Sequence, residues 1–233
     1  MKKKIKLENS NWSFSGNVPK NFDNHIKKSI PFYEDSHKIG LMISDFFLPE
    51  NSNYSDLGCS TGKFIKALSL RHKNKNIKFI GYDSILEMVN LSKRICKNDK
   101  RISIKKKDIL KEKFKNQNFI TSFYTLQFIH PSNRQKLFTK IFKSLKWGGG
   151  FLFFEKVRAQ DARFQDMTNQ IYTEIKIDNG FNSEEIIQKS RSLKGVMEPF
   201  SSVANVQLVK RAGFKDVMTV FKYINFEGFL AIK

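Results

Sequence analysis

The sequence predicts an α/β fold whose centre is a doubly wound, largely parallel sheet of seven strands. Three observations lead to this prediction. After about residue 52, short apolar runs alternate with amphipathic stretches of helical length. A glycine-containing turn follows the first of these runs. The last two apolar runs, 217–221 and 226–232, are separated by only a short turn, which is typical of an antiparallel hairpin at a sheet edge.

The strands and helices are expected in a regular order along the chain. Before the hairpin, strands are predicted at 54–57, 77–83, 101–107, 119–124 and 151–155. Helices are predicted from the glycine turn to about residue 71, over 85–96, from Pro131 to about residue 145, and over 203–211. Pro131 suits the first turn of a helix capped by His130, and Gly148-Gly149-Gly150 is expected to close that helix.

The chain is expected to form one domain over residues 1–233, because it has no internal repeat, low-complexity tract or Pro/Gly/Ser-rich linker. Residues 158–197 interrupt the alternation with a polar, helical stretch between strands five and six. Ligands of parallel sheets bind beyond the carboxyl ends of the strands. An insertion that leaves strand five at that edge can fold over a ligand, and so can residues 10–45. These two segments are the candidate lids.

Composition excludes several classes of protein. No stretch approaches the ~18 consecutive apolar residues that suit a membrane-spanning helix, and residues 1–8 lack the apolar run of a signal peptide. We therefore expect no membrane association and a location in the cytoplasm. The two cysteines, Cys59 and Cys96, fit reduced thiols, and no cluster of ligands predicts a metal site.

The formal net charge of +20 raises the question of nucleic-acid binding. Lysines are spread along the whole chain, and Lys105-Lys106-Lys107 is the densest run after the N-terminus. Such a spread favours a solvated basic surface over a dedicated nucleic-acid face. Direct binding of tRNA stays open on this observation.

The turn after the first strand is the main candidate for a cofactor site. It has the sequence Asp56-Leu57-Gly58-Cys59-Ser60-Thr61-Gly62. Glycine lets the backbone turn sharply and approach a ligand, because it tolerates positive φ. The free N–H groups of the following helix can bind an anion such as a methionyl carboxylate. Asp56 is expected to support the ammonium group beside that carboxylate, or the loop itself.

Two further acidic residues follow the next two strands. Asp83 lies 21 residues after Gly62 (83 − 62), close to the spacing of about 20 expected for an acid that binds both ribose hydroxyls. Asp108 follows the third strand, where it can accept a hydrogen bond from an adenine amino group or cap a helix. The form of the turn, the third acid and the terminal hairpin favour S-adenosylmethionine over a dinucleotide. They predict a Rossmann-like class I methyltransferase fold.

Longer motifs resemble one family in particular. They are Trp12-x-Phe14, Ser29-Ile30-Pro31-Phe32-Tyr33, Asp56-Leu57-Gly58-Cys59-Ser60, Thr125-Leu126-Gln127-Phe128-Ile129-His130-Pro131, Gly149-Gly150, Glu155-Lys156, Gln188-Lys189, Val196-Met197 and Ala212-Gly213-Phe214. From about Trp12 to Lys233 the chain resembles the carboxy-S-adenosyl-L-methionine synthases, which act in the 5-oxyacetic acid modification of the tRNA wobble uridine. The Thr-Leu-Gln-Phe run and the Ser-Ile-Pro-x-Tyr segment are the motifs most particular to that family.

The resemblance implies a reaction and a set of contacts. Enzymes of this family convert S-adenosylmethionine to its carboxymethyl-sulfonium analogue, with prephenate as the donor of the carboxyl group. Tyr33 is implied to close over the cofactor, and Asp83 with Ser84 to hold its ribose. The residues expected to contact S-adenosylmethionine, or its carboxylated or demethylated form, are Tyr33, Asp56, Gly58, Cys59, Ser60, Gly62, Asp83, Ser84, Asp108, Ile109 and Phe123. A homodimer is also expected.

Two positions depart from the family pattern. An asparagine that touches the cofactor at the end of strand four is replaced by Phe123. The arginine that grips the new carboxylate falls, without gaps, on Ser190, with Arg191 one place later. A shift of one residue rotates a helical side chain by about 100°. Because a guanidinium stays charged and donates paired hydrogen bonds, Arg191 is the predicted catalytic residue beside Tyr33, with Lys189 in reserve.

Two alternatives to carboxyl transfer share the same cofactor pocket. An ordinary methyltransferase acting on a small molecule or on RNA is favoured by the changes at Phe123 and Ser190. A basic RNA-binding protein with a vestigial cofactor fold is disfavoured, because the acids and glycines of the pocket are intact. Carboxyl transfer itself requires a closed, dry site, since an ylide formed from the sulfonium methyl group is quenched by water.

Overall fold

The computed structural model describes residues 18–233, with side chains described from Phe22 onward. The Trp12-x-Phe14 motif and residues 10–17 of the first candidate lid lie outside the described residues.

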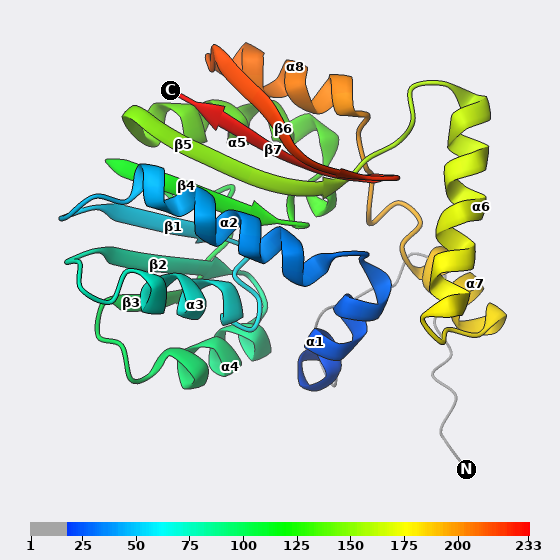
Figure 1. Ribbon diagram of the computed structural model, residues 1–233, viewed down its shortest axis with the longest axis horizontal. Helices are drawn as coiled ribbons and strands as arrows, with labels where there is room; N and C mark the ends of the chain where they lie inside the picture. Colours follow the sequence, from blue (N-terminus) through cyan, green and yellow to red (C-terminus); the bar gives the residue numbers. More distant parts are fainter. Residues whose placement is uncertain (1–17) are drawn as a thin grey trace.

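Seven strands form one sheet in the order β3-β2-β1-β4-β5-β7-β6 (Figure 1). They are β1 Asn53–Leu57, β2 Lys78–Asp83, β3 Ile102–Lys106, β4 Gln117–Phe123, β5 Leu145–Lys156, β6 Asp216–Tyr223 and β7 Phe226–Ile232. Strands β1 to β5 are parallel, and β7 runs antiparallel to both β5 and β6. The predicted fold class is confirmed, including the C-terminal antiparallel hairpin.

Helices cover both faces of the sheet. They are α1 Val18–Ser29, α2 Tyr33–Phe47, α3 Lys63–Arg71, α4 Leu86–Cys96, α5 Pro131–Ser144, α6 Ala162–Asp178, α7 Ser183–Ser192 and α8 Ser202–Ala212, with a 3-10 turn at Leu126–Phe128. Figure 1 shows α2, α3 and α4 on one face and α5 with α8 on the other. Helices α6 and α7 fill the predicted insertion, which contains no strand, and stand beyond the end of the sheet.

The hydrophobic core consists of one layer on each face of the sheet. On one side, Leu137 and Phe138 of α5 and Val209 of α8 pack against the sheet. On the other side, Phe64 and Leu68 of α3 belong to a cluster that also includes residues of α2 and α4. The amphipathic pattern of these helices therefore fixes which face of the sheet each one covers.

The glycine run at the end of α5 was expected to close that helix, and this expectation is wrong. Helix α5 ends at Ser144, and Gly148, Gly149 and Gly150 lie inside β5. A Cβ at Gly150 would lie 2.8 Å from the ring of Phe47, so α2 packs directly on the strand backbone there. Gly150 therefore allows the close approach of α2, and the glycine run does not end α5.

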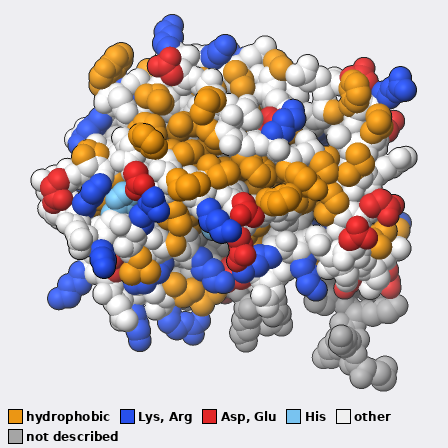
Figure 2. Space-filling view, viewed as in Figure 1, with side chains coloured by type: hydrophobic (Ala, Val, Ile, Leu, Met, Phe, Trp, Pro, Cys, Tyr) orange, Lys and Arg blue, Asp and Glu red, His pale blue; other side chains and the backbone are white. Residues whose placement is uncertain are grey.

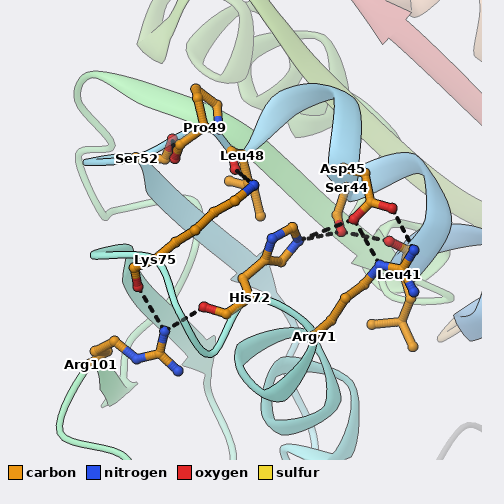
Figure 3. Close-up of polar contacts among 10 residues, drawn as sticks. All are labelled: Leu41, Ser44, Asp45, Leu48, Pro49, Ser52, Arg71, His72, Lys75 and Arg101. Atoms are coloured by element: carbon orange, nitrogen blue, oxygen red, sulfur yellow. Dashed lines mark hydrogen bonds and ion pairs between the residues drawn. The ribbon is translucent and has the colours of Figure 1, made fainter.

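A polar network ties the helix layer together at the amino edge of the sheet, opposite the ligand edge (Figure 3). The buried His72 ring hydrogen-bonds Ser44 Oγ of α2 at 2.8 Å. Arg101 donates to the carbonyl groups of His72 and Lys75 at 2.7 and 2.9 Å. Arg71 donates to Asp45 through its guanidinium. These contacts hold α2 and α3 in place from the far side, which leaves the carboxyl edge free for a site.

Within residues 18–233, no helix is both long and apolar enough to cross a bilayer. The same residues contain no group of three or more His, Cys, Asp or Glu side chains that could hold a metal ion.

Candidate active site

A cavity of about 980 Å³ lies at the carboxyl edge of the parallel strands. The turns after β1, β2, β3 and β4 form one wall, and α1, α6, α7 and the end of β5 form the other. The strand order reverses between β1 and β4, and this is the position where ligands bind in doubly wound sheets. The volume lies near the upper end of the range of roughly 300–1,000 Å³ for small-molecule sites.

The turn after β1 brings backbone to the cavity wall. Gly58 has φ +81°, and a Cβ there would lie 2.1 Å from Thr125 Oγ1. The N–H groups of Gly58 and Cys59 donate to the carbonyl of Tyr82 at 2.8 and 2.9 Å, which fixes the turn against β2. Gly58, Cys59 and Ser60 all border the cavity. Glycine is therefore required at position 58 by both conformation and space.

Gly62, predicted to contact the ligand, does not border the cavity. It has φ +80°, and a Cβ there would lie 2.2 Å from Ser92 Oγ. The residue is the N-cap of α3. Its glycine is explained by close packing of α3 against α4 rather than by ligand contact.

Asp56 is buried at the end of β1 and borders the cavity. Thr121 Oγ1 donates to its carboxylate at 3.0 Å, and Tyr54 contacts the same threonine hydroxyl. Burial raises the pKa of Asp56 to about 7, although the Thr121 hydrogen bond opposes the shift. A cationic ligand group nearby would hold this carboxyl in its charged form.

Asp83 is the last residue of β2, and its side chain links two turns. Its Oδ2 accepts the N–H of Ser60 at 2.9 Å and its Oδ1 accepts the N–H of Ile85 at 2.9 Å. Burial raises the pKa of Asp83, and these backbone hydrogen bonds oppose the rise. Each carboxylate oxygen keeps a second lone pair, so the side chain can also accept two ligand hydroxyls at the cavity wall.

The remaining residues predicted from the turns lie around the same wall. Asp108 is exposed at its rim, and Asp108 Oδ1 accepts the N–H of Leu110 at 2.9 Å. Ile109 is buried and Ser84 is exposed, and both border the cavity. An apolar side chain beside a rim carboxylate can bind a flat, polar-edged ring such as adenine.

An aromatic wall faces these turns. The Tyr33 ring lies 4.5 Å from the ring of His37 and 5.9 Å from that of Tyr124. Phe123 stacks on Phe154 at 5.1 Å and borders the cavity, so this position offers an apolar contact in place of an amide. Burial lowers the pKa of His37 to about 4, which keeps its ring neutral at physiological pH.

Helix α7 carries the predicted carboxylate-binding residues. Ser190 and Arg191 both border the cavity with exposed side chains. The neighbouring Lys189 is more deeply placed, because its ammonium donates to Ser29 Oγ at 3.0 Å and hydrogen-bonds the ring of His25. The structure thus holds the reserve residue against α1 and leaves Arg191 at the rim.

Several residues that shape the cavity were not predicted from the sequence. Asp23 of α1 does not border the cavity, but it accepts a hydrogen bond from Thr61 at 3.0 Å and pairs with Lys63 at 2.9 Å, which joins α1 to the turn after β1. Tyr172 and Lys176 of α6 border the cavity themselves. Their spacing of four residues, which places two side chains on one helix face, was the only signal available.

Comparison with known proteins supports the same fold. Residues 55–149 match the methyltransferase domain family. The human N-acetylserotonin methyltransferase bound to SAM has a TM-score of 0.65 at 18% identity, over 94% of this chain and 56% of that one. A putative O-methyltransferase from Nostoc punctiforme has a TM-score of 0.66 at 13% identity, over 93% of this chain and 60% of that one. This chain therefore spans little more than half of these solved methyltransferases.

Curated relatives match over nearly their full length. A carboxy-S-adenosyl-L-methionine synthase from Staphylococcus epidermidis is 39% identical over 95% of this chain and 97% of its own. Those from Campylobacter lari and Sulfurimonas denitrificans are 31% and 34% identical over 95% of this chain and 94% of theirs. These relatives favour carboxyl transfer over ordinary methylation. By this extended similarity, the chain belongs to the carboxy-S-adenosyl-L-methionine synthase family.

Proposed function

We propose that this protein converts S-adenosylmethionine and prephenate to carboxy-S-adenosylmethionine. One observation carries the proposal: a single cavity has two different walls. The wall built on Gly58 and Asp83 suits a nucleoside, and the lid helices form the opposite wall. The first wall suits the cofactor, because Asp83 keeps lone pairs for ribose hydroxyls. The second leaves room for another small molecule at the same edge.

The proposed contacts of S-adenosylmethionine follow the wall. Asp83 and Ser84 hold the ribose, Asp108 and Ile109 flank the adenine, and Asp56 supports the methionyl ammonium. Gly58, Cys59 and Ser60 present backbone to the methionyl group, with Tyr33 and Phe123 closing the aromatic side. Gly62 supports this turn through packing.

The proposed reaction balances without a metal or a redox cofactor. Prephenate loses carbon dioxide and its ring hydroxyl, which aromatises the ring and leaves phenylpyruvate. The hydroxide takes a proton from the sulfonium methyl group, forming water, and the methyl carbon bonds to the carbon dioxide. The protein orients the two substrates and excludes bulk water, and Arg191 grips the carboxylate of the product.

Mass spectrometry tests this proposal directly. Purified protein incubated with S-adenosylmethionine and prephenate should form a product heavier than S-adenosylmethionine by one carbon dioxide, together with phenylpyruvate. Omission of prephenate should abolish both products. Formation of S-adenosylhomocysteine with an added acceptor, and no carboxylated product, would replace the proposal with ordinary methyl transfer.

The same proposal covers the setting of the enzyme. The two buried free cysteines agree with a reducing compartment, and we propose the cytoplasm as the location. The product is proposed to serve modification of the tRNA wobble uridine, as the family resemblance implies. That step requires no direct binding of tRNA by this chain.

A homodimer is also proposed, through the face of the sheet formed by β5, β7 and β6. Figure 1 shows no helix over β7 and β6 on the side of the sheet opposite α5 and α8, and Figure 2 shows hydrophobic side chains gathered in a band on that side. Met218 is 59% exposed there, and Phe46 of the adjoining α2 is 84% exposed. Large exposed apolar patches mark interaction sites. Light scattering should show a dimer that Phe46→Glu dissociates, and a wild-type monomer would refute this assembly.

A further inference from the structure

Three lysines gather on the lid wall of the cavity. The ammonium groups of Lys156 and Lys176 lie 4.4 and 4.6 Å from the centre of the Tyr172 ring. Lys189 borders the same cavity from α7. Lys156 ends β5, whereas Tyr172 and Lys176 come from α6, so three separate elements bring the lysines together. We refer to Lys156, Lys176 and Lys189 as the lysine triad.

The charges of Lys156 and Lys176 lack local neutralisation by a carboxylate. Among the described residues, neither Lys156 nor Lys176 forms an ion pair with a carboxylate. The pKa of Lys156 is lowered to about 8, mainly by burial and further by the positive charges of Lys176 and Arg158. The pKa of Lys189 is also lowered to about 8, mainly by burial and further by the positive charges of Lys176 and Lys156. The wall thus concentrates positive charge that an anionic ligand would stabilise.

Groups around the lysine triad do not remove this charge. Besides the triad itself, Lys156 faces Arg158 and the Tyr172 ring. Lys189 contacts His25, whose pKa is lowered to about 4 by burial and by Lys189. The carboxylate of Glu185 in α7 opposes this shift, because its negative charge raises the pKa of His25. His25 is therefore neutral near pH 7, and the net charge of the wall remains positive.

Contacts between the lid helices hold the lysine triad in place. Tyr172 Oη donates to the carbonyl of Ser29 at 2.7 Å, which joins α6 to α1. Asn179 donates to the carbonyl of Lys28 at 2.9 Å at the end of the same pair of helices. The Tyr172 ring also lies 5.3 Å from that of Phe226. Cations fixed beside two aromatic rings suit a ligand that carries both carboxylates and an apolar ring.

We propose that the lysine triad binds the carboxylate that the second substrate keeps, and not the one that it transfers. The inference rests on the proposed function, which supplies a donor with two carboxylates. A carboxylate that leaves as carbon dioxide loses its charge in the transition state. Ion pairs to it would stabilise the ground state more than the transition state and slow the reaction. The retained carboxylate keeps its charge throughout, so the cations hold it without this cost.

Calorimetry with phenylpyruvate tests the proposal, because this product carries only the retained carboxylate. Titrations use the full chain saturated with S-adenosylhomocysteine, which prevents turnover. Lys176→Met and Lys156→Met keep the side-chain length but remove the charge. Each should weaken phenylpyruvate binding by about tenfold or more and leave S-adenosylmethionine affinity within about twofold of wild type. Lys210→Met, an exposed substitution on α8, is the matched control and should change neither affinity.

The pH dependence gives a second measurement on the wild-type protein. Lys156 and Lys189 are charged below their pKa values of about 8 and neutral above them. Affinity for phenylpyruvate should therefore fall between pH 7 and pH 9.5, and both Met variants should show a smaller fall. A flat profile in wild type would contradict the assignment.

The outcomes separate this inference from the proposed function. Triad-dependent binding of phenylpyruvate without carboxylated product would support the lysine triad and refute the proposed reaction. Product formation with Met variants that bind phenylpyruvate and turn over prephenate like wild type would refute the lysine triad alone. Absence of phenylpyruvate binding to the wild-type protein would also overturn it.

Discussion

The carboxylate of Asp83 accepts the backbone N–H of Ser60 at 2.9 Å, and so connects the turn after β2 to the turn after β1. A second oxygen of the same carboxylate accepts the N–H of Ile85 at 2.9 Å. Asp83 therefore shapes the wall to which it also contributes the proposed ribose-binding carboxylate. A substitution of Asp83 can affect both the shape of the turns and the binding of the ligand, so a substitution that preserves the fold is needed to measure binding.

Asp83→Asn should weaken S-adenosylmethionine binding by about tenfold or more while the protein stays folded. The amide keeps one acceptor oxygen but loses the charge, and charged hydrogen bonds contribute about 1.5–3 kcal/mol each. Calorimetry measures the affinity and circular dichroism the fold. Asp99→Asn is the control, because Asp99 accepts the N–H of Arg101 at 3.0 Å away from the cavity. It should lower stability only, and unchanged affinity in a folded Asp83→Asn protein would refute the role of Asp83.

Gly58→Ala should destabilise the protein far more than Gly148→Ala. Both glycines have positive φ, +81° and +74°, so both substitutions carry backbone strain of ~1 kcal/mol or more. Only at Gly58 would the new Cβ collide, 2.1 Å from Thr125 Oγ1, whereas nothing lies within 4 Å at Gly148. Thermal unfolding monitored by circular dichroism compares the two. Equal losses of stability would show that the Gly58 turn has room that the structure does not display.

Glu155→Gln should reduce the loss of stability between pH 6.5 and pH 8. Burial raises the pKa of Glu155 to about 8, against the opposing effect of Arg134. The folded state thus holds a proton that the unfolded state releases near pH 4.5, so the stabilisation is complete below about pH 4.5 and is lost as the pH rises through 8.

Glutamine keeps an acceptor for the Leu126 N–H, which Glu155 accepts at 3.0 Å, and removes the titration. Over this window wild type should lose about 1–2 kcal/mol more than the variant, because one proton changes stability by ~1.4 kcal/mol per pH unit. Chemical denaturation at the two pH values measures the difference. Parallel losses in both proteins would assign the pH dependence to other groups.

The sequence predicted the sheet well because its strands and helices depend on local patterns. The apolar run that became β2, Lys78–Asp83, and the Gly58 turn needed no knowledge of distant residues. The run from Gly148 to Gly150 was misassigned because Gly150 serves a contact with Phe47, about 100 residues earlier. Glycine signals a need for space, and the sequence alone does not show what fills that space.

The side of the site proposed for the cofactor could also be predicted from the sequence, whereas the lid side could not. Asp83 follows a strand at a recognisable spacing from the glycine turn. The lysine triad comes from β5, α6 and α7, and only the folded insertion brings these side chains to the same cavity. The sequence indicated a polar, helical stretch over residues 158–197, but not its division into α6 and α7 or which faces of these helices meet the cavity. Arg191 illustrates this limit. The sequence favoured Arg191 as the carboxylate-binding residue, but the structure places the neighbouring Lys189 deeper, against α1.

Arg191→Ala should retain S-adenosylmethionine binding but lose formation of the carboxylated product from prephenate. Arg191 borders the cavity with an exposed side chain, so its role requires the lid to close until the guanidinium reaches the new carboxylate. Arg191→Lys should recover little activity, because one ammonium cannot replace the paired donors of a guanidinium.

Arg163→Ala is the control, because Arg163 is an exposed arginine on α6 that does not border the cavity, and this variant should remain active. Mass spectrometry of the product, with calorimetry of S-adenosylmethionine binding, gives the two readouts. Full product formation by Arg191→Ala would refute the carboxylate-gripping role of Arg191.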